Sequence, residues 1–75
     1  MTNFPTREQV AALRETYTKG TRVELVRMDD PYTKLRPGDR GFVTGVDDSG
    51  SVHVSWDGGS SLAAIWGVDE IRIIS

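Results

Sequence analysis

The chain has 75 residues, no cysteine and a formal net charge of −2. A chain this short forms one domain with a thin core that no disulfide can stabilise, so packed aliphatic and aromatic side chains must hold it together. It has neither an apolar run of about 18 residues nor an N-terminal apolar stretch of signal-peptide length, which argues against membrane association and predicts a cytoplasmic protein.

Basic and acidic residues are interleaved along the chain, although residues 1–40 carry eight of the nine basic groups. Binding a nucleic-acid backbone requires Lys and Arg gathered on one surface. The interleaving therefore favours an ordinary solvated surface.

An amphipathic helix is expected to begin near Arg7 and to end before Lys19. Thr6 and Gln9 form a capping-box pattern, in which each side chain satisfies a backbone donor of the first turn. Apolar residues then follow at spacings of three and four, namely Val10, Leu13 and Tyr17. This stripe needs a cover, which is either an open side or end of the β-structure, with Phe4 packed beside the helix, or a partner or second copy of the chain.

The first strand is expected over residues 20–26, with Val23 and Leu25 on one face. Residues 28–39 then form a connection that is too long for a hairpin turn, and long connections in compact domains are often functional. Turn signals stand at both ends of this loop, Asp30-Pro31 and Pro37-Gly38, and the second pair fits a type II turn.

Four further strands are expected over residues 40–46, 51–56, 60–66 and 71–74, with a turn at residues 67–70. Glycine within a strand often marks a bulge, a sharp bend or a close approach of another backbone, and one of these is expected at positions 41 and 45. In the third strand the alternation predicts core positions at Val52, Val54 and Trp56, and outward positions at Ser51, His53 and Ser55.

Five short strands joined by tight turns predict a mainly β fold, a small SH3-like five-stranded barrel with an N-terminal α-helix. Residues 1–19 are expected to form a helical extension packed on the barrel, and residues 20–75 the barrel itself.

Three motifs stand in order in the chain: M-x-D-P-Y-x-x-L-x-P-G from Met28, V-D-D from Val46, and W-D-x-G-S-S-L from Trp56. Across residues 19–74 the chain resembles a family of small bacterial and phage proteins described only as a domain of unknown function. The resemblance implies the barrel and a phage or mobile-element setting, and it implies no activity.

Two shorter resemblances point to other small barrels. Residues 20–23 followed by residues 37–43 are similar to KOW-type modules, which have a glycine-valine start and a later G-x-V strand. Residues 52–60 are similar to the substrate-binding barrel of Mind-bomb-type ubiquitin ligases, with Gly58 where that family has asparagine.

No catalytic constellation is evident, so we expect neither an enzyme nor a cofactor. His53 is the single histidine and stands on the outward face of a regular strand, without the convergent partners that a triad needs. A metal site is not expected either, because one histidine without cysteine leaves only carboxylates as ligands.

A non-catalytic protein-binding or peptide-binding module is the favoured interpretation, and the long loop is its candidate site. Tyr32 and Trp66 are expected to form a groove, unless Tyr32 is half buried and merely pins the loop to the barrel. Aspartates beside Tyr32 favour a basic segment of an unknown host or phage protein, which this chain would bind as an adaptor or inhibitor. The full candidate set is Asp29, Asp30, Tyr32, Leu35, Asp57 and Trp66.

The alternative is a KOW-like module that binds nucleic acid through basic residues gathered on one side of the barrel. These candidates are Arg22, Arg27, Lys34, Arg36 and Arg40. A monomer or a weak homodimer is compatible with either interpretation.

Overall fold

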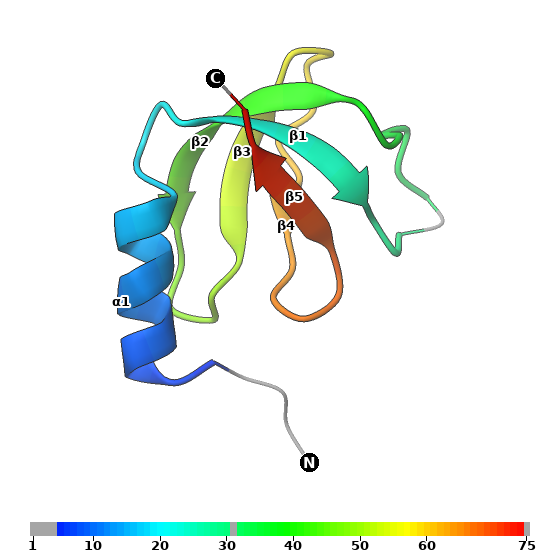
Figure 1. Cartoon of the computed structure of the whole chain (residues 1–75). Helices are drawn as coiled ribbons and strands as arrows, with labels where there is room; N and C mark the ends of the chain where they lie inside the picture. The colour runs from blue at the N-terminus through cyan, green and yellow to red at the C-terminus, as the bar shows by residue number, and fades with distance from the viewer. Residues whose placement is uncertain (1–4, 31, 75) are drawn as a thin grey trace.

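The computed structural model describes residues 5–30 and 32–74, so Phe4 and Pro31 lie outside the described residues. Within these residues one helix precedes five strands: α1 (Arg7–Thr16), β1 (Arg22–Arg27), β2 (Arg40–Val46), β3 (Val52–Trp56), β4 (Ala63–Ala64) and β5 (Glu70–Ile73). Figure 1 shows a curved sheet with α1 standing beside it near β2. The predicted mainly β class with an N-terminal helix is confirmed.

The five strands pair antiparallel in one sheet, in the order β4-β3-β2-β1-β5. The first strand thus lies between β2 and the last strand. Among the described residues no pairing joins β4 to β5, so the sheet is not closed into a barrel. The closed cylinder expected from the sequence is therefore not confirmed.

The shortness of β4 accounts for part of this difference. A strand was expected over residues 60–66, yet only Ala63 and Ala64 pair with β3. The chain forms hydrogen-bonded turns on both sides of β4. Gly59 N donates to Trp56 O (2.9 Å) before it, and Asp69 N donates to Ile65 O (3.0 Å) after it. Too little extended chain is left for β4 to reach β5.

The core lies on one face of the sheet, where most of the predicted inward positions are found. The buried cluster consists of Val23, Leu25, Val43, Val52, Val54, Trp56 and Ala64. The indole N–H of the buried Trp56 has a hydrogen-bond partner, because Nε1 donates to the carbonyl oxygen of Leu62 at 2.9 Å. One outward prediction is wrong: Ser51 is only 5% exposed, because it precedes β3 and belongs to the turn held by Asp47.

Both glycines of β2 have the structural roles expected of them. A side chain at Gly41 would meet β3, since a Cβ placed there would lie 2.5 Å from the carbonyl oxygen of Ser55. Near Gly45 the pairing register with β3 shifts, between Val43 and Gly45, as in a β-bulge. The β2–β3 ladder is therefore irregular at a glycine where the sequence predicts a bulge or a bend.

Helix α1 begins with the predicted capping box. Gln9 N donates to Thr6 Oγ1 (3.1 Å) and Thr6 N donates to Gln9 Oε1 (2.8 Å). Val10 is buried, while Leu13 and Tyr17 are half-buried, so the apolar stripe turns towards the rest of the chain. The boundary drawn at residue 19 stays a prediction. The structure shows no helix in the described ranges that is long and apolar enough to cross a bilayer.

Candidate binding surface

The loop between β1 and β2 is anchored to the body of the protein at both ends. Met28 and Leu35 are half-buried and pack against the core cluster. At its start, Asp29 N donates to Asp69 Oδ1 (2.9 Å), and the second oxygen of this carboxylate accepts from Ile65 N (2.9 Å). Asp69, which the sequence interpretation did not single out, thus ties the loop to the turn before β5.

The far end of the loop is closed by the predicted type II turn. Gly38 has the positive φ of +98° that the third position of this turn requires, and Asp39 N donates to Arg36 O at 3.0 Å. Asp39 adds a second bond, since its Oδ2 accepts from Arg36 N at 2.9 Å. The loop is therefore a shaped segment with defined ends.

Tyr32 stands at the tip of this loop, where its side chain is free of the body. The residue is 92% exposed, while its backbone N donates to Asp30 Oδ1 at 2.9 Å. The alternative of a half-buried tyrosine that pins the loop is therefore wrong. Among the described large apolar residues that are exposed, Tyr32 has the highest exposed fraction.

A depression of about 350 Å³ lies beside Tyr32, between the loop and the β3–β4 turn. Leu35 and Leu62 provide apolar surface in it, and Lys34 and Asp39 provide one charge of each sign. Of the six predicted contact residues, Tyr32 and Leu35 are brought together here.

Trp66 lines a different depression, of about 220 Å³, which it shares with Tyr17 of the helical segment and with Ile71. The side chain is half-buried. The structure thus places Tyr32 and Trp66 at separate surfaces, and the expected groove between them is not formed.

Asp57, another predicted contact, is held by Arg22. The two terminal guanidinium nitrogens of Arg22, Nη1 and Nη2, donate to the two carboxylate oxygens of Asp57 at 3.0 and 2.9 Å. These hydrogen bonds hold the pKa of Asp57 below its usual value and raise the pKa of Arg22. Asp57, a candidate for binding a protein partner, and Arg22, a candidate for binding nucleic acid, therefore neutralise each other on the outer face of the sheet.

A second ion-pair group crosses the same outer face. Glu24 accepts from Arg72 Nε (2.7 Å) and from Arg40 Nε (3.3 Å), and the hydrogen bond from Arg72 is the main reason that the pKa of Glu24 lies below its usual value. Arg40 and Arg22 are thus paired with acids. Within the described ranges no ion pair involves the remaining candidates Arg27, Lys34 and Arg36.

His53 contacts a carboxylate, yet the arrangement is that of a turn. Its Nε2 lies 2.9 Å from Asp47 Oδ2, while Asp47 Oδ1 accepts from Ser49 Oγ, Ser49 N and Ser51 N. Led by the Ser49 hydroxyl, these bonds lower the pKa of Asp47 to about 2. The described part of the chain holds no group of three or more His, Cys, Asp or Glu able to bind a metal ion.

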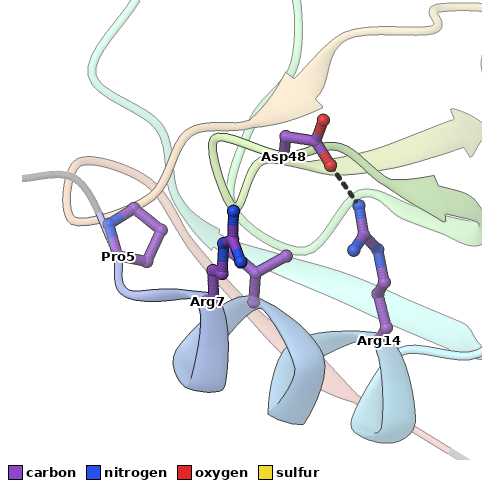
Figure 2. Close-up of a pocket in the computed structure, with 5 residues that line it drawn as sticks. Pro5, Arg7, Arg14 and Asp48 are labelled. Atoms are coloured by element: carbon purple, nitrogen blue, oxygen red, sulfur yellow. Dashed lines mark hydrogen bonds and ion pairs between the residues drawn. The ribbon is translucent and has the colours of Figure 1, made fainter.

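A further depression, of about 510 Å³, lies where the start of α1 meets the β2–β3 turn. Figure 2 shows Arg14 reaching from the helix to Asp48, with Arg7 and Pro5 further along the rim. The Arg14–Asp48 distance is 2.8 Å, and Arg14 Nε also donates to Val46 O at 3.2 Å. These contacts hold the helix against the sheet.

Comparison with known proteins gives a family and no activity. No curated protein and no solved structure shows significant similarity to the chain. The model of a family described as a domain of unknown function, DUF4314, matches residues 6–74, which include α1 and all five strands. The chain therefore belongs to the DUF4314 family.

Proposed function

We propose that this protein is a non-catalytic binding module that recognises a basic segment of another protein through the loop between β1 and β2. The exposure of Tyr32 carries the proposal, because 92% of this residue is accessible at the tip of a loop whose ends are fixed. Because both ends of the loop are fixed before binding, a docking partner restricts fewer degrees of freedom, so the aromatic contact contributes more fully to affinity.

The neighbouring charges set the class of partner. Asp30 is exposed beside Tyr32, and Asp29 is exposed at the start of the loop. Tyrosine supplies contact area with few rotatable bonds, and nearby carboxylates favour Lys or Arg in the partner segment. The depression next to Tyr32 offers Leu35 and Leu62 to an apolar side chain of the same segment.

The wider setting is part of the proposal. We take the fold as SH3-like, which is supported by five short antiparallel strands in which the first pairs with both the second and the last. The phage or mobile-element setting, the role as an adaptor or inhibitor of a host protein, and the cytoplasmic location stay predictions.

A selection from a random displayed peptide library would test the proposed site. Peptides are enriched on the wild-type protein at low salt, and their dissociation constants are then measured by fluorescence anisotropy against wild type, Tyr32→Ala and Phe42→Ala. Phe42 is a matched control, because it is an exposed aromatic residue of β2 that does not line the depression beside Tyr32. We expect enrichment of Lys and Arg, a loss of about tenfold or more in affinity for Tyr32→Ala, and no loss for Phe42→Ala.

Asp30→Asn supplies a second readout of the same site. The variant removes the charge, so selected basic peptides should bind more weakly and with less dependence on salt. Peptides that bind Tyr32→Ala as tightly as wild type would contradict the proposal.

Nucleic-acid binding remains a second candidate, favoured by Arg27, Lys34 and Arg36, which have no acidic partner among the described residues. Arg22 and Arg40 would add less, because their charges are already paired. If mixed-sequence oligonucleotides bind, their affinity should fall steeply as salt rises and should drop for Lys34→Ala with Arg36→Ala. An absence of binding at low salt would remove this candidate.

A further inference from the structure

β5 presents an unpaired edge to its surroundings. It stands at one end of the strand order, and among the described residues it pairs with β1 alone. Ile74 lies directly after β5, and its N donates to Arg22 O at 2.9 Å. Hydrogen-bonded positions recur at every second residue of an antiparallel strand, so the backbone N–H and C=O of Ile74 and of Arg72 face β1. The backbone N–H and C=O of Ile71 and Ile73 alternate with these and point away from β1, towards the free edge of the sheet.

The bonds of Leu25 support this alternation independently. Leu25 N donates to Asp39 O (2.7 Å) and Leu25 O accepts from Gly38 N (2.8 Å), so both of its backbone groups are used on the β2 side. Ile71 lies opposite Leu25 and therefore forms no ladder bond with it. Outside the β1–β5 ladder, no hydrogen bond to the amides of Ile71 and Ile73 is found in the described ranges. These residues form a template for another strand.

We propose that this edge binds the β5 strand of a second copy of the chain, antiparallel and with Ile71 opposite Ile71. The inference is independent of the proposed function, which uses the loop between β1 and β2. A two-fold axis through this pairing makes the contact self-complementary and closed.

The charges of β5 select this register over its neighbours. With Ile71 opposite Ile71, Glu70 of each copy stands opposite Arg72 of the other, in the non-hydrogen-bonded positions where side chains are closest. A shift that sets Ile71 opposite Ile73 would instead place Arg72 against Arg72. Like charges directly opposite each other destabilise a sheet, so that register is disfavoured.

The surroundings of Arg72 are suited to a second carboxylate. Arg40, Glu24 and Arg72 form a row with one excess positive charge, in which Arg72 Nε lies 2.7 Å from Glu24 Oε2. Glu70 is exposed and forms no ion pair among the described residues. In the dimer, Glu70 of the second copy extends this row and neutralises it.

The pairing is short, so the dimer is weak. Four residues of β5 bury far less than the roughly 1,000 Å² that a stable interface needs, and apolar contact comes chiefly from Ile73, which is 48% exposed. We expect a monomer–dimer equilibrium that sedimentation equilibrium detects between about 10 μM and about 1 mM.

Ile73→Pro is the most direct test. Proline at this position removes an N–H that faces away from β1, so the pairing of β1 with β5 is kept while the edge is blocked. We expect Ile73→Pro to sediment as a monomer throughout, with the circular dichroism of the wild type, and the matched variant Ile73→Val, which keeps the N–H and an apolar side chain, to dimerise. A wild type that stays monomeric up to about 1 mM, or an Ile73→Pro variant that dimerises as the wild type does, would overturn the proposal.

Glu70→Lys gives an answer even if the proline variant does not fold. It places a lysine opposite Arg72 twice in each dimer, so the dissociation constant should rise by about tenfold or more, and less at high salt. Isotope-filtered NMR of a mixed labelled sample then checks the register. A contact between Hα of Glu70 and Hα of Arg72 in different copies supports it, and an Arg72–Arg72 contact contradicts it.

Discussion

Gly41 is a residue at which the packing of β2 against β3 leaves no room for a side chain. A Cβ there would lie 2.5 Å from Ser55 O and 2.9 Å from Trp56 Cα, and both atoms belong to the backbone of β3. Gly41→Ala should therefore lower the free energy of unfolding by about 1–3 kcal/mol. Urea denaturation measures this loss.

Gly45→Ala is the matched control in the same strand. No atom lies within 4 Å of a Cβ placed at Gly45, and its φ is not positive. This variant should change the free energy of unfolding by less than about 0.5 kcal/mol. If both variants lost the same free energy of unfolding, the loss would come from replacing a strand glycine as such and not from the contact with β3.

Asp47 links the stability of the β2–β3 turn to pH. Its pKa is about 2 in the folded protein and 3.8 for an unperturbed carboxyl, mainly because of the Ser49 hydroxyl. A lowered folded-state pKa contributes stability that is complete above 3.8 and is lost as pH falls through about 2. The side chain is 41% exposed, so solvent screening reduces the contribution to about 1 kcal/mol.

Asp47→Asn should remove this contribution at neutral pH. Between pH 5 and pH 2, urea denaturation should show the wild type losing about 1 kcal/mol more than Asp47→Asn. Ser49→Ala keeps the carboxylate but removes its main donor, so its loss should be intermediate. Identical acid profiles for all three proteins would contradict this role of Asp47.

At the scale of single elements, α1 depends on its first turn. A helix of ten residues is marginal alone, and the Thr6–Gln9 capping box satisfies two of its free donors. Thr6→Ala should lower the free energy of unfolding by about 1 kcal/mol, and Thr6→Ser, which keeps the acceptor, should cost much less. Thermal unfolding followed by circular dichroism checks both, and an equal loss for Thr6→Ser would argue against the cap.

Elements whose signals are local could be predicted from the sequence. The capping box, the Pro37-Gly38 turn and the alternation in β3 each depend on residues a few positions apart, and all three are found. The end of β4 could not be predicted, because the turn that follows it is held by Asp69, whose carboxylate bonds both Ile65 and the distant Asp29. The burial of Ser51 could not be predicted for a similar reason, since its backbone N donates to the Asp47 carboxylate and holds it in the turn.

The candidate site was less predictable than the fold, because a site is defined by contacts between distant segments. The exposure of Tyr32 agrees with the signals of a shaped loop, yet its separation from Trp66 depends on how the loop and the turn before β5 sit on the sheet. The pairing of Arg22 with Asp57 joins residues 35 positions apart and has no pattern in the sequence. Ion pairs of this kind decide which charges remain available to a partner.

At the scale of the whole molecule, the open sheet should be visible in hydrogen exchange. The amides of Arg72 and Ile74 face β1, whereas the alternation of the ladder turns those of Ile71 and Ile73 away from β1, and no bond outside the ladder reaches them in the described residues. At low micromolar concentration, where a weak dimer is dissociated, NMR should show fast exchange at Ile71 and Ile73 and slow exchange at Arg72. In a closed barrel both edges of β5 would be bonded, so slow exchange at all of these amides in the monomer would show that the strands close on each other in solution. If exchange at Ile71 and Ile73 became slow only as the protein concentration rose, it would instead indicate that a second copy binds this edge.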